Sequence, residues 1–159
     1  MTSPDHLSFS GTLRRSDGRV MIIRDSLSAL ESPTWGHSFA GSPRAAEPIP
    51  SAVRRCAEKQ LGILNMIVEP LLPLLGNDSS SDSVLAEVHP SYIVTSDEIP
   101  QLADAVEARW ENPLALGKIA REYPHEFSPL LVIHAMRLPF FGGTPHAFAE
   151  SFLEDRATG

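Results

Sequence analysis

The stretch from Gly41 to Ile63 constrains this chain more than any other part of its sequence. It is built on a glycine, five residues, Glu47, seven residues, Arg55 and a closing glycine–aliphatic pair. Residues 51–61 within it carry apolar side chains at the 3.6-residue period of an α-helix, and the closing glycine is typical of a helix end. We therefore expect a tight Gly- and Pro-rich loop that leads into a helix.

Composition limits the kind of protein. The 159 residues are 42% hydrophobic, enough for one domain with a core, so we expect a disordered tail over 1–5 and a single domain over 6–159. A net charge of −7 disfavours nucleic acid and anionic membrane as partners. One cysteine excludes an internal disulfide framework. Neither a leader nor a membrane span is expected, which predicts a cytoplasmic protein; its oligomeric state stays open.

The other elements follow from turn signals and periodicity. Asp17-Gly18 is typical of a hairpin turn, and Asn112-Pro113 is typical of a helix start. Expected strands cover 7–14, 19–24, 35–39, 83–95 and 105–110, with an edge strand within 64–75; expected helices cover 112–121, 128–137 and 145–154.

Four runs of the sequence carry a resemblance to a known family. They are DHLSFSGTLRRSDGRVMIIR, WGHSFAGSPR, AVRRCAEKQLGI and FSPLLVIHA. Together with the spacing of the Nudix box, G-x5-E-x7-R-E-U-x-E-E-x-G-U (U aliphatic), they make residues 5–136 similar to type 1 isopentenyl-diphosphate isomerase. The resemblance implies an α+β Nudix fold, a mixed β-sheet sandwiched between helices. It also implies an enzyme that protonates and deprotonates an isoprenoid double bond through a cationic transition state.

The chain departs from that family at its chemical positions. Where the box has its three later glutamates, this sequence has Cys56, Lys59 and Gln60. The catalytic cysteine of the family's N-S-V-C-G-H-P motif is replaced by Ala40, and the metal-binding histidine of that motif by Ser42.

Two further motifs of the family also differ. Its E-N-E-V motif, which holds a catalytic glutamate, is matched to residues 81–84, SDSV, and the tryptophan that faces the isoprenoid cation to Leu130. Of the metal histidines, one matches His6 and an upstream one lies in a segment this chain lacks. One histidine, two serines and a glutamine cannot assemble a divalent-metal site. The resemblance therefore predicts no metal and no cofactor.

Glu87 is the candidate acid. Strand alternation places it on one face with Ser83, Leu85 and His89. A carboxyl in an apolar pocket has a raised pKa, as a general acid for an alkene requires, and His89 would orient Glu87 or share its proton. The alternatives are a glutamate at the cavity mouth or paired with an arginine, and a structural histidine.

Further candidates come from the closing helix and the loop before Ala40. His134 follows Leu130 by four residues, so both point the same way, and we expect His134 to be catalytic. His37 and Trp35 are expected, with Ala40, Ser83, Leu85 and Leu130, to line the substrate site. The alternatives are hydrogen-bonded core histidines and a packed tryptophan, although Trp35 or Trp110 could present a π face to a cation.

The remaining polar residues of the box are predicted to be structural. Glu47 is expected to cap the loop-to-helix turn, and Cys56 to be a buried, unreactive thiol. Arg54, Arg55 and Lys59 are expected to form a solvated helix face rather than an anion site.

Two functional hypotheses remain. The first is a repurposed isomerase scaffold that isomerises or cyclises a terpenoid without a metal, with a relocated acid in an apolar pocket. The second is a catalytically inactive Nudix scaffold that binds a small molecule or a protein. A Nudix pyrophosphohydrolase is set aside because it needs the missing glutamates.

Overall fold

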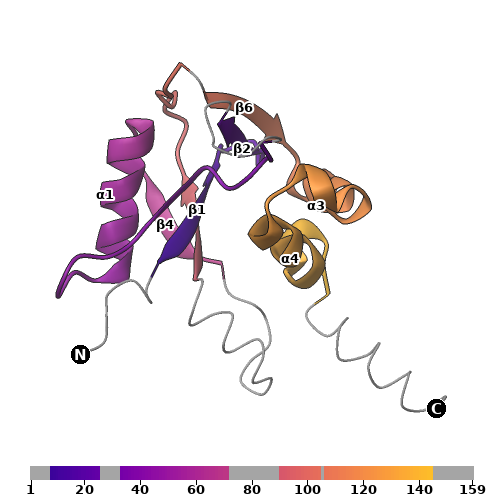
Figure 1. Cartoon of the computed structure of the whole chain (residues 1–159). Coiled ribbons are helices and arrows are strands. Elements are labelled where there is room, and N and C mark those ends of the chain that lie inside the picture. Colours follow the sequence, from indigo (N-terminus) through magenta and orange to yellow (C-terminus); the bar gives the residue numbers. More distant parts are fainter. Residues whose placement is uncertain (1–7, 26–32, 72–89, 105, 145–159) are drawn as a thin grey trace, which may run out of the picture.

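The computed structural model describes residues 8–25, 33–71, 90–104 and 106–144, and they form a mixed β-sheet with helices on both faces (Figure 1). The sheet has the strand order β4-β5-β1-β2-β6, and β3 also pairs with β1. This confirms the predicted α+β fold. The strands are β1 (Phe9–Arg14), β2 (Val20–Asp25), β3 (Phe39–Gly41), β4 (Ile67–Pro70), β5 (Ser91–Thr95) and β6 (Val106–Glu111). The helices are α1 (Ile49–Leu61), α3 (Pro113–Glu122) and α4 (Pro129–Arg137), with short 3-10 turns η2 (Pro124–Glu126) and η3 (Pro139–Phe141).

The side chains of strand β1 point alternately to the two faces of the sheet. The strand runs parallel to β5 and antiparallel to β3. Because side chains alternate along a strand, Phe9 and Leu13 point toward α1, where they join its core. By the same alternation Ser10 and Thr12 point to the face away from α1. Helices α3 and α4 lie on that side of the sheet (Figure 1).

Each face has its own apolar core. The core under α1 contains Phe9, Leu13, Met21, Phe39, Ala52, Val53, Cys56, Ala57, Leu61, Ile63 and Val94. The core under α3 and α4 contains Val20, Ile22, Trp35, Leu116, Ala120, Phe127, Leu131, Ala135, Leu138 and Phe141. Burial of apolar surface at about 25 cal/mol per Å² makes these two clusters the main stabilising contribution.

The predicted hairpin is present, but its ladder is interrupted. β1 and β2 share the register pair Arg14 and Val20 next to the turn. Beyond it, the hydroxyl of Ser38 stands between the strands: it accepts a hydrogen bond from the Leu13 amide at 2.8 Å and donates one to the Met21 carbonyl at 2.5 Å. A side chain from residues 35–38 thus satisfies backbone groups that a regular hairpin would pair directly.

Predicted helix ends are confirmed in three places. Asn112 accepts hydrogen bonds from the first amides of α3, and Ser128 accepts one from the Leu131 amide of α4. Gly62 ends α1 with φ +69°, a left-handed conformation that favours glycine. Within the described ranges, no helix is long and apolar enough to cross a bilayer.

Several predicted elements lie outside the described residues. They are the tail over 1–5, the first part of the strand expected over 83–95, and the helix expected over 145–154. The last five residues of that strand form β5.

Candidate active site

A row of buried hydroxyl groups crosses the sheet face that α4 covers. Ser10 and Thr12 of β1 and Ser91 of β5 are 3%, 1% and 5% exposed. The Ser10 hydroxyl donates a hydrogen bond to the Ser91 hydroxyl at 3.1 Å. Since a buried hydroxyl is costly unless it is hydrogen-bonded, this polar row contrasts with the apolar side chains that surround it.

The row continues into a pair of histidines. The Thr12 hydroxyl lies 3.0 Å from Nδ1 of His37, and Nε2 of His37 lies 3.0 Å from Nδ1 of His134. The two imidazole rings are tilted by 57° with their centroids 4.9 Å apart. Thr12, His37 and His134 thus form one hydrogen-bonded line from the sheet to α4.

The loop that precedes β3 positions this line. Gly36 exchanges two backbone hydrogen bonds with Ile23 of β2. Trp35 donates its amide to the Glu126 carbonyl and accepts from the Ser128 amide, immediately before α4. Residues 35–38 are therefore held on both sides, which fixes His37 between β1 and α4.

The electrostatics of the pair favour a neutral His37 ring. Desolvation, and then the neighbouring His134, lower the pKa of His37 to about 3 from its ordinary value of 6.5. Two ring nitrogens that face each other at hydrogen-bond distance share one proton, and a second positive charge there would be repelled. At neutral pH the line from Thr12 to His134 can pass a proton but holds no net charge on His37.

Ala40 lies on the same face of the sheet. It stands opposite Ser10 in the β1–β3 ladder, and its neighbour Phe39 points into the core under α1. Ser10 precedes Thr12 by two residues, which places Ala40 roughly 7 Å along the strand from the row of Thr12. Ala40 is exposed. Its carbonyl accepts a hydrogen bond from the Gln60 side-chain amide at 2.6 Å.

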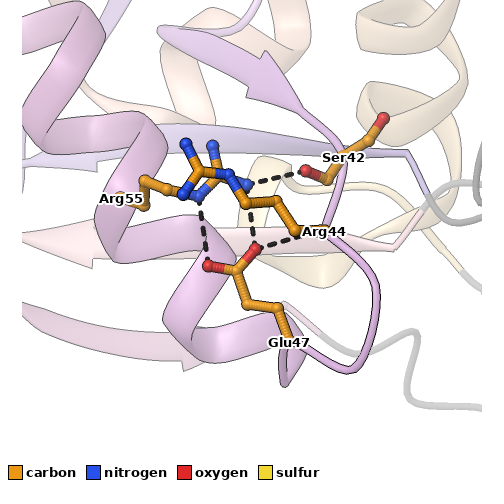
Figure 2. Close-up of polar contacts among 4 residues, drawn as sticks. All are labelled: Ser42, Arg44, Glu47 and Arg55. Carbon is orange, nitrogen blue, oxygen red and sulfur yellow. Dashed lines mark hydrogen bonds and ion pairs between the residues drawn. The ribbon is translucent and has the colours of Figure 1, made fainter.

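On the other face, Glu47 and Arg55 lock the loop that enters α1 (Figure 2). The carboxylate of Glu47 accepts two hydrogen bonds from Arg55, at 2.9 and 3.1 Å, and one from the Arg44 amide at 2.8 Å. Arg55 also donates to the Ser42 carbonyl at 2.9 Å. The hydrogen bonds from Arg55 and then Arg44 lower the pKa of Glu47 to about 2 from 4.5.

These contacts decide two predictions about the box. The capping role of Glu47 is confirmed, because it holds the turn that precedes α1. Arg55 lies close to solvent, as expected, but its guanidinium also binds Glu47 and Ser42, contacts that the helix period did not predict. Cys56 is buried, as expected.

The other described candidates lie on both faces of the sheet: Trp35 belongs to the core under α3 and α4, whereas Trp110 packs against the core under α1. Trp35 is 8% exposed, and its ring faces two guanidinium groups, with Cζ of Arg24 at 4.7 Å and Cζ of Arg109 at 5.4 Å from the ring centroid. Trp110 lies in the same way under Arg15, at 3.8 Å. Leu130 is half-buried in the first turn of α4.

Glu87, His89, Ser83 and Leu85 lie outside the described residues. Within the ranges that the structure describes, no three His, Cys, Asp or Glu side chains come together as a metal site would require.

Sequence reasoning found His37 and His134 separately but missed their contact and missed Thr12. The two histidines are 97 residues apart. The alternation of β1 was the available signal for Thr12, because it puts a hydroxyl on the face opposite Leu13.

No protein-family model matches the chain. Three proteins named isopentenyl-diphosphate Delta-isomerase resemble it. The one from Agromyces mediolanus is 37% identical over 143 residues, 87% of this chain and 69% of that protein. The one from Kocuria rhizophila is 33% identical over 135 residues (81% and 74%), and the one from Brevibacterium linens 30% over 142 residues (86% and 78%).

Solved structures support the fold. A protein from Deinococcus radiodurans has a TM-score of 0.56 at 23% identity, covering 76% of this chain and 74% of that one. A protein assigned to the Nudix hydrolases has a TM-score of 0.52 at 12% identity, covering 82% and 68%. At these identities the likeness concerns the fold alone, and the predicted Nudix fold is confirmed.

Proposed function

Since this chain belongs to the isopentenyl-diphosphate isomerase family, we propose that it isomerises or cyclises an isoprenoid substrate with acid–base groups of the protein and without a metal. Family membership supports an isomerase and an isoprenoid substrate. The metal-free mechanism is the finer step, and it depends on the residues that stand at the chemical positions.

The hydrogen bond from Gln60 to Ala40 carries this proposal. The side-chain amide of Gln60, at a glutamate position of the box, donates to the Ala40 carbonyl at 2.6 Å. A carboxylate at that position could not donate this bond, and an amide is a weaker ligand than a carboxylate for a divalent cation. Ala40 has no transferable proton, and Ser42 offers a hydroxyl where the family has an imidazole. The described part of the site therefore fits proton transfer by other side chains better than a metal centre.

Glu87 is the proposed acid, and a second register of the E-N-E-V motif supports it. The run from Leu85 to Val88, LAEV, shares a glutamate and the valine with that motif, whereas SDSV at 81–84 shares the valine alone. In this register, which replaces the match to residues 81–84, the acid is not relocated: one of the motif's two glutamates is retained as Glu87. Glu87 stands three residues before Pro90, whose carbonyl accepts a hydrogen bond from the Ser10 amide of β1.

The reaction conserves protons. The O–H bond of the Glu87 carboxyl breaks as the π electrons of an alkene take the proton, which leaves a carbocation and a carboxylate. A C–H bond next to the cationic carbon then breaks, its electron pair forms the new double bond, and the proton passes to a base of the protein. In a cyclisation, a second double bond attacks the cation before that proton leaves.

The residues that stand at the family's chemical positions are expected to leave a larger and more apolar substrate pocket. Leu130 and Leu85 offer aliphatic surface, and Ala40 is smaller than a cysteine. A water-excluding, uncharged pocket prolongs the life of a carbocation. We therefore propose a bulkier substrate than isopentenyl diphosphate, with Ser83 and His89 beside Glu87 and with Trp35 and His37 at the end near Ala40.

The test is deuterium incorporation in D2O containing EDTA. Isopentenyl diphosphate, farnesyl and geranylgeranyl diphosphate and the two matching alcohols are incubated with the purified chain, and products and recovered substrates are analysed by mass spectrometry. We expect incorporation into at least one of the four longer prenyl compounds, and a loss of roughly 10²-fold in Glu87→Gln, because an amide cannot serve as the acid. Glu107→Gln, on the exposed strand β6, is the matched control.

Two results would contradict the proposal. Unchanged incorporation in Glu87→Gln would exclude this residue as the acid. No incorporation into any of the five compounds, with binding of a prenyl alcohol detected by calorimetry, would instead support the inactive binding scaffold.

A further inference from the structure

The two histidines on the α4 face are joined by hydrogen bonds that a packing contact alone does not require. His134 is 2% exposed and Thr12 1% exposed, and their link through His37 consists of two hydrogen bonds of 3.0 Å. An apolar core needs no imidazole to join a helix to a sheet, and a buried polar group costs free energy that its hydrogen bonds do little more than offset. Two titratable rings in one hydrogen-bonded line suggest a role in proton transfer.

The line has two equivalent proton arrangements. In one, the Thr12 hydroxyl donates to Nδ1 of His37, and Nε2 of His37 donates to Nδ1 of His134. In the other, His134 donates to His37 and His37 donates to the Thr12 oxygen. Each ring nitrogen in the line changes between donor and acceptor. A proton taken up at one end is therefore accommodated by a shift along the line.

We propose that the His37–His134 pair accepts the proton that leaves the carbocation, and that Thr12 positions the pair through its hydrogen bond with Nδ1 of His37. This inference rests on the proposed function, since it supplies the acceptor for the second half of that reaction. The C–H bond next to the cationic carbon breaks, its electrons form the double bond, and the proton joins an imidazole nitrogen of the pair. Water carries the proton back to the Glu87 carboxylate, so one turnover consumes no protons.

Geometry and charge both suit this role. The pair lies on the sheet face of Ala40, roughly two strand residues from it. A neutral imidazole is a weak base, but a hydrogen next to a carbocation is strongly acidic and needs no stronger acceptor. A neutral His37 also places no positive charge of its own beside the developing cation.

The test separates the two halves of the reaction by the ratio of product to deuterium exchange. In D2O, protonation by Glu87 followed by return of a proton to Glu87 labels recovered substrate, whereas loss of a proton to the pair yields product. His134→Asn keeps a hydrogen-bonding atom near Nδ1 but cannot take up a proton. We expect product formation to fall roughly 10²-fold in this variant while deuterium still enters the recovered substrate. His37→Gln is expected to behave in the same way.

Further variants distinguish proton transfer from structural support. Thr12→Val keeps the shape of the side chain and removes the hydroxyl, so the ratio of product to exchange should fall less than in His134→Asn, and Thr12→Ser should restore it. His125→Asn changes an exposed histidine outside the site and should leave the ratio unchanged.

The outcomes are distinguishable from those of the proposed function. Loss of both product and exchange in Glu87→Gln alone supports the acid and says nothing against the pair. If His134→Asn and His37→Gln both keep the wild-type ratio of product to exchange, the pair is a structural link and the inference is wrong. If the wild-type chain exchanges no deuterium with any of the five compounds, the proposed function itself falls, and this inference with it.

Discussion

The two faces of the sheet carry different kinds of polar groups. Under α1, the spacing of the box survives as a lock, in which Glu47 and Arg55 hold the entry loop above an apolar core (Figure 2). Under α4, a hydroxyl row and His134 are buried, with His37 half-buried between them, where apolar side chains would pack as well. The first arrangement stabilises the fold, and the second has the groups that move protons.

The residues that identify the family differ from the residues that could move protons. The α1 face carries the spacing by which the family is recognised, yet its polar residues bond to one another and to the backbone. The α4 face lacks that spacing, although His37 and His134 stand in two of the runs that carry the family resemblance. We infer that the fold and the reaction of this chain depend on different sides of one sheet, and three predictions test that division.

The largest change in the free energy of unfolding is expected from Gly117→Ala in α3. A methyl group there would lie 1.8 Å from the Phe141 carbonyl oxygen, a backbone atom that cannot turn aside. In an open helix the same change would stabilise by about 1 kcal/mol. Here we expect a loss of roughly 3 kcal/mol from overpacking, measured by urea unfolding.

Gly41→Ala on the α1 face is the comparison for that variant. Its methyl group would meet the Cys56 sulfur at 2.3 Å, and this atom belongs to a side chain that Cys56→Ala removes. The double variant should recover much of the stability that Gly41→Ala loses. Equal losses for both glycine variants, with no recovery, would contradict the contacts described under α1.

The next effect is a loss of stability in mild acid that originates on the α4 face. The pKa of His37 is about 3 in the folded chain and 6.5 in its ordinary state. Between these values the unfolded chain binds a proton that the folded chain does not, so the free energy of unfolding falls as the pH drops from 6.5 toward 3. One such proton gives a slope of at most about 1.4 kcal/mol per pH unit.

His37→Asn should flatten that slope, measured by urea unfolding at half-unit steps of pH. His125→Asn should leave the slope as it is in the wild type. A wild-type chain whose stability is constant between pH 6.5 and 4 would show that His37 is not held neutral by its surroundings.

The smallest effect is expected on the α1 face in stronger acid. The pKa of Glu47 is lowered from 4.5 to about 2, chiefly by its hydrogen bond from Arg55. Its stabilising contribution is therefore complete above pH 4.5 and is lost as the pH falls toward 2. Because this pair is close to solvent, the effect is small.

Glu47→Gln should lower the thermal midpoint slightly at pH 7 and make it less sensitive to pH below 4.5. It should not change the ratio of product to exchange, because Glu47 lies on the other face. A change in that ratio would contradict the inference that the fold and the reaction depend on different faces of the sheet.

Local signals predicted much of the fold. The cap Asn112, the start of a helix at Ser128, the glycine at 62 and the turn at 17–18 all act within a few residues, so their effect can be read from the sequence. The interrupted hairpin could not be predicted in this way. It depends on Ser38, a residue of a later segment, reaching two backbone groups on β1 and β2.

The site was predicted less completely for the same reason. His37 and His134 were each singled out, yet nothing near either residue indicates the other, since their contact needs the loop at 35–38 and α4 to be in place. Thr12 has the weakest signal, a single hydroxyl in a strand. Arg55 was assigned to solvent because helix periodicity does not show that a preceding loop folds back over it.

The central claim is a reaction without a metal, and the metal dependence of deuterium incorporation by the wild-type chain tests it most directly. Deuterium incorporation from D2O into the five prenyl compounds should be measured after EDTA treatment, and again after adding Mg²⁺, Mn²⁺ or Zn²⁺. The account predicts incorporation into a longer prenyl compound at the same rate in EDTA and with each metal. Incorporation into isopentenyl diphosphate alone, and with an added divalent metal alone, would contradict it.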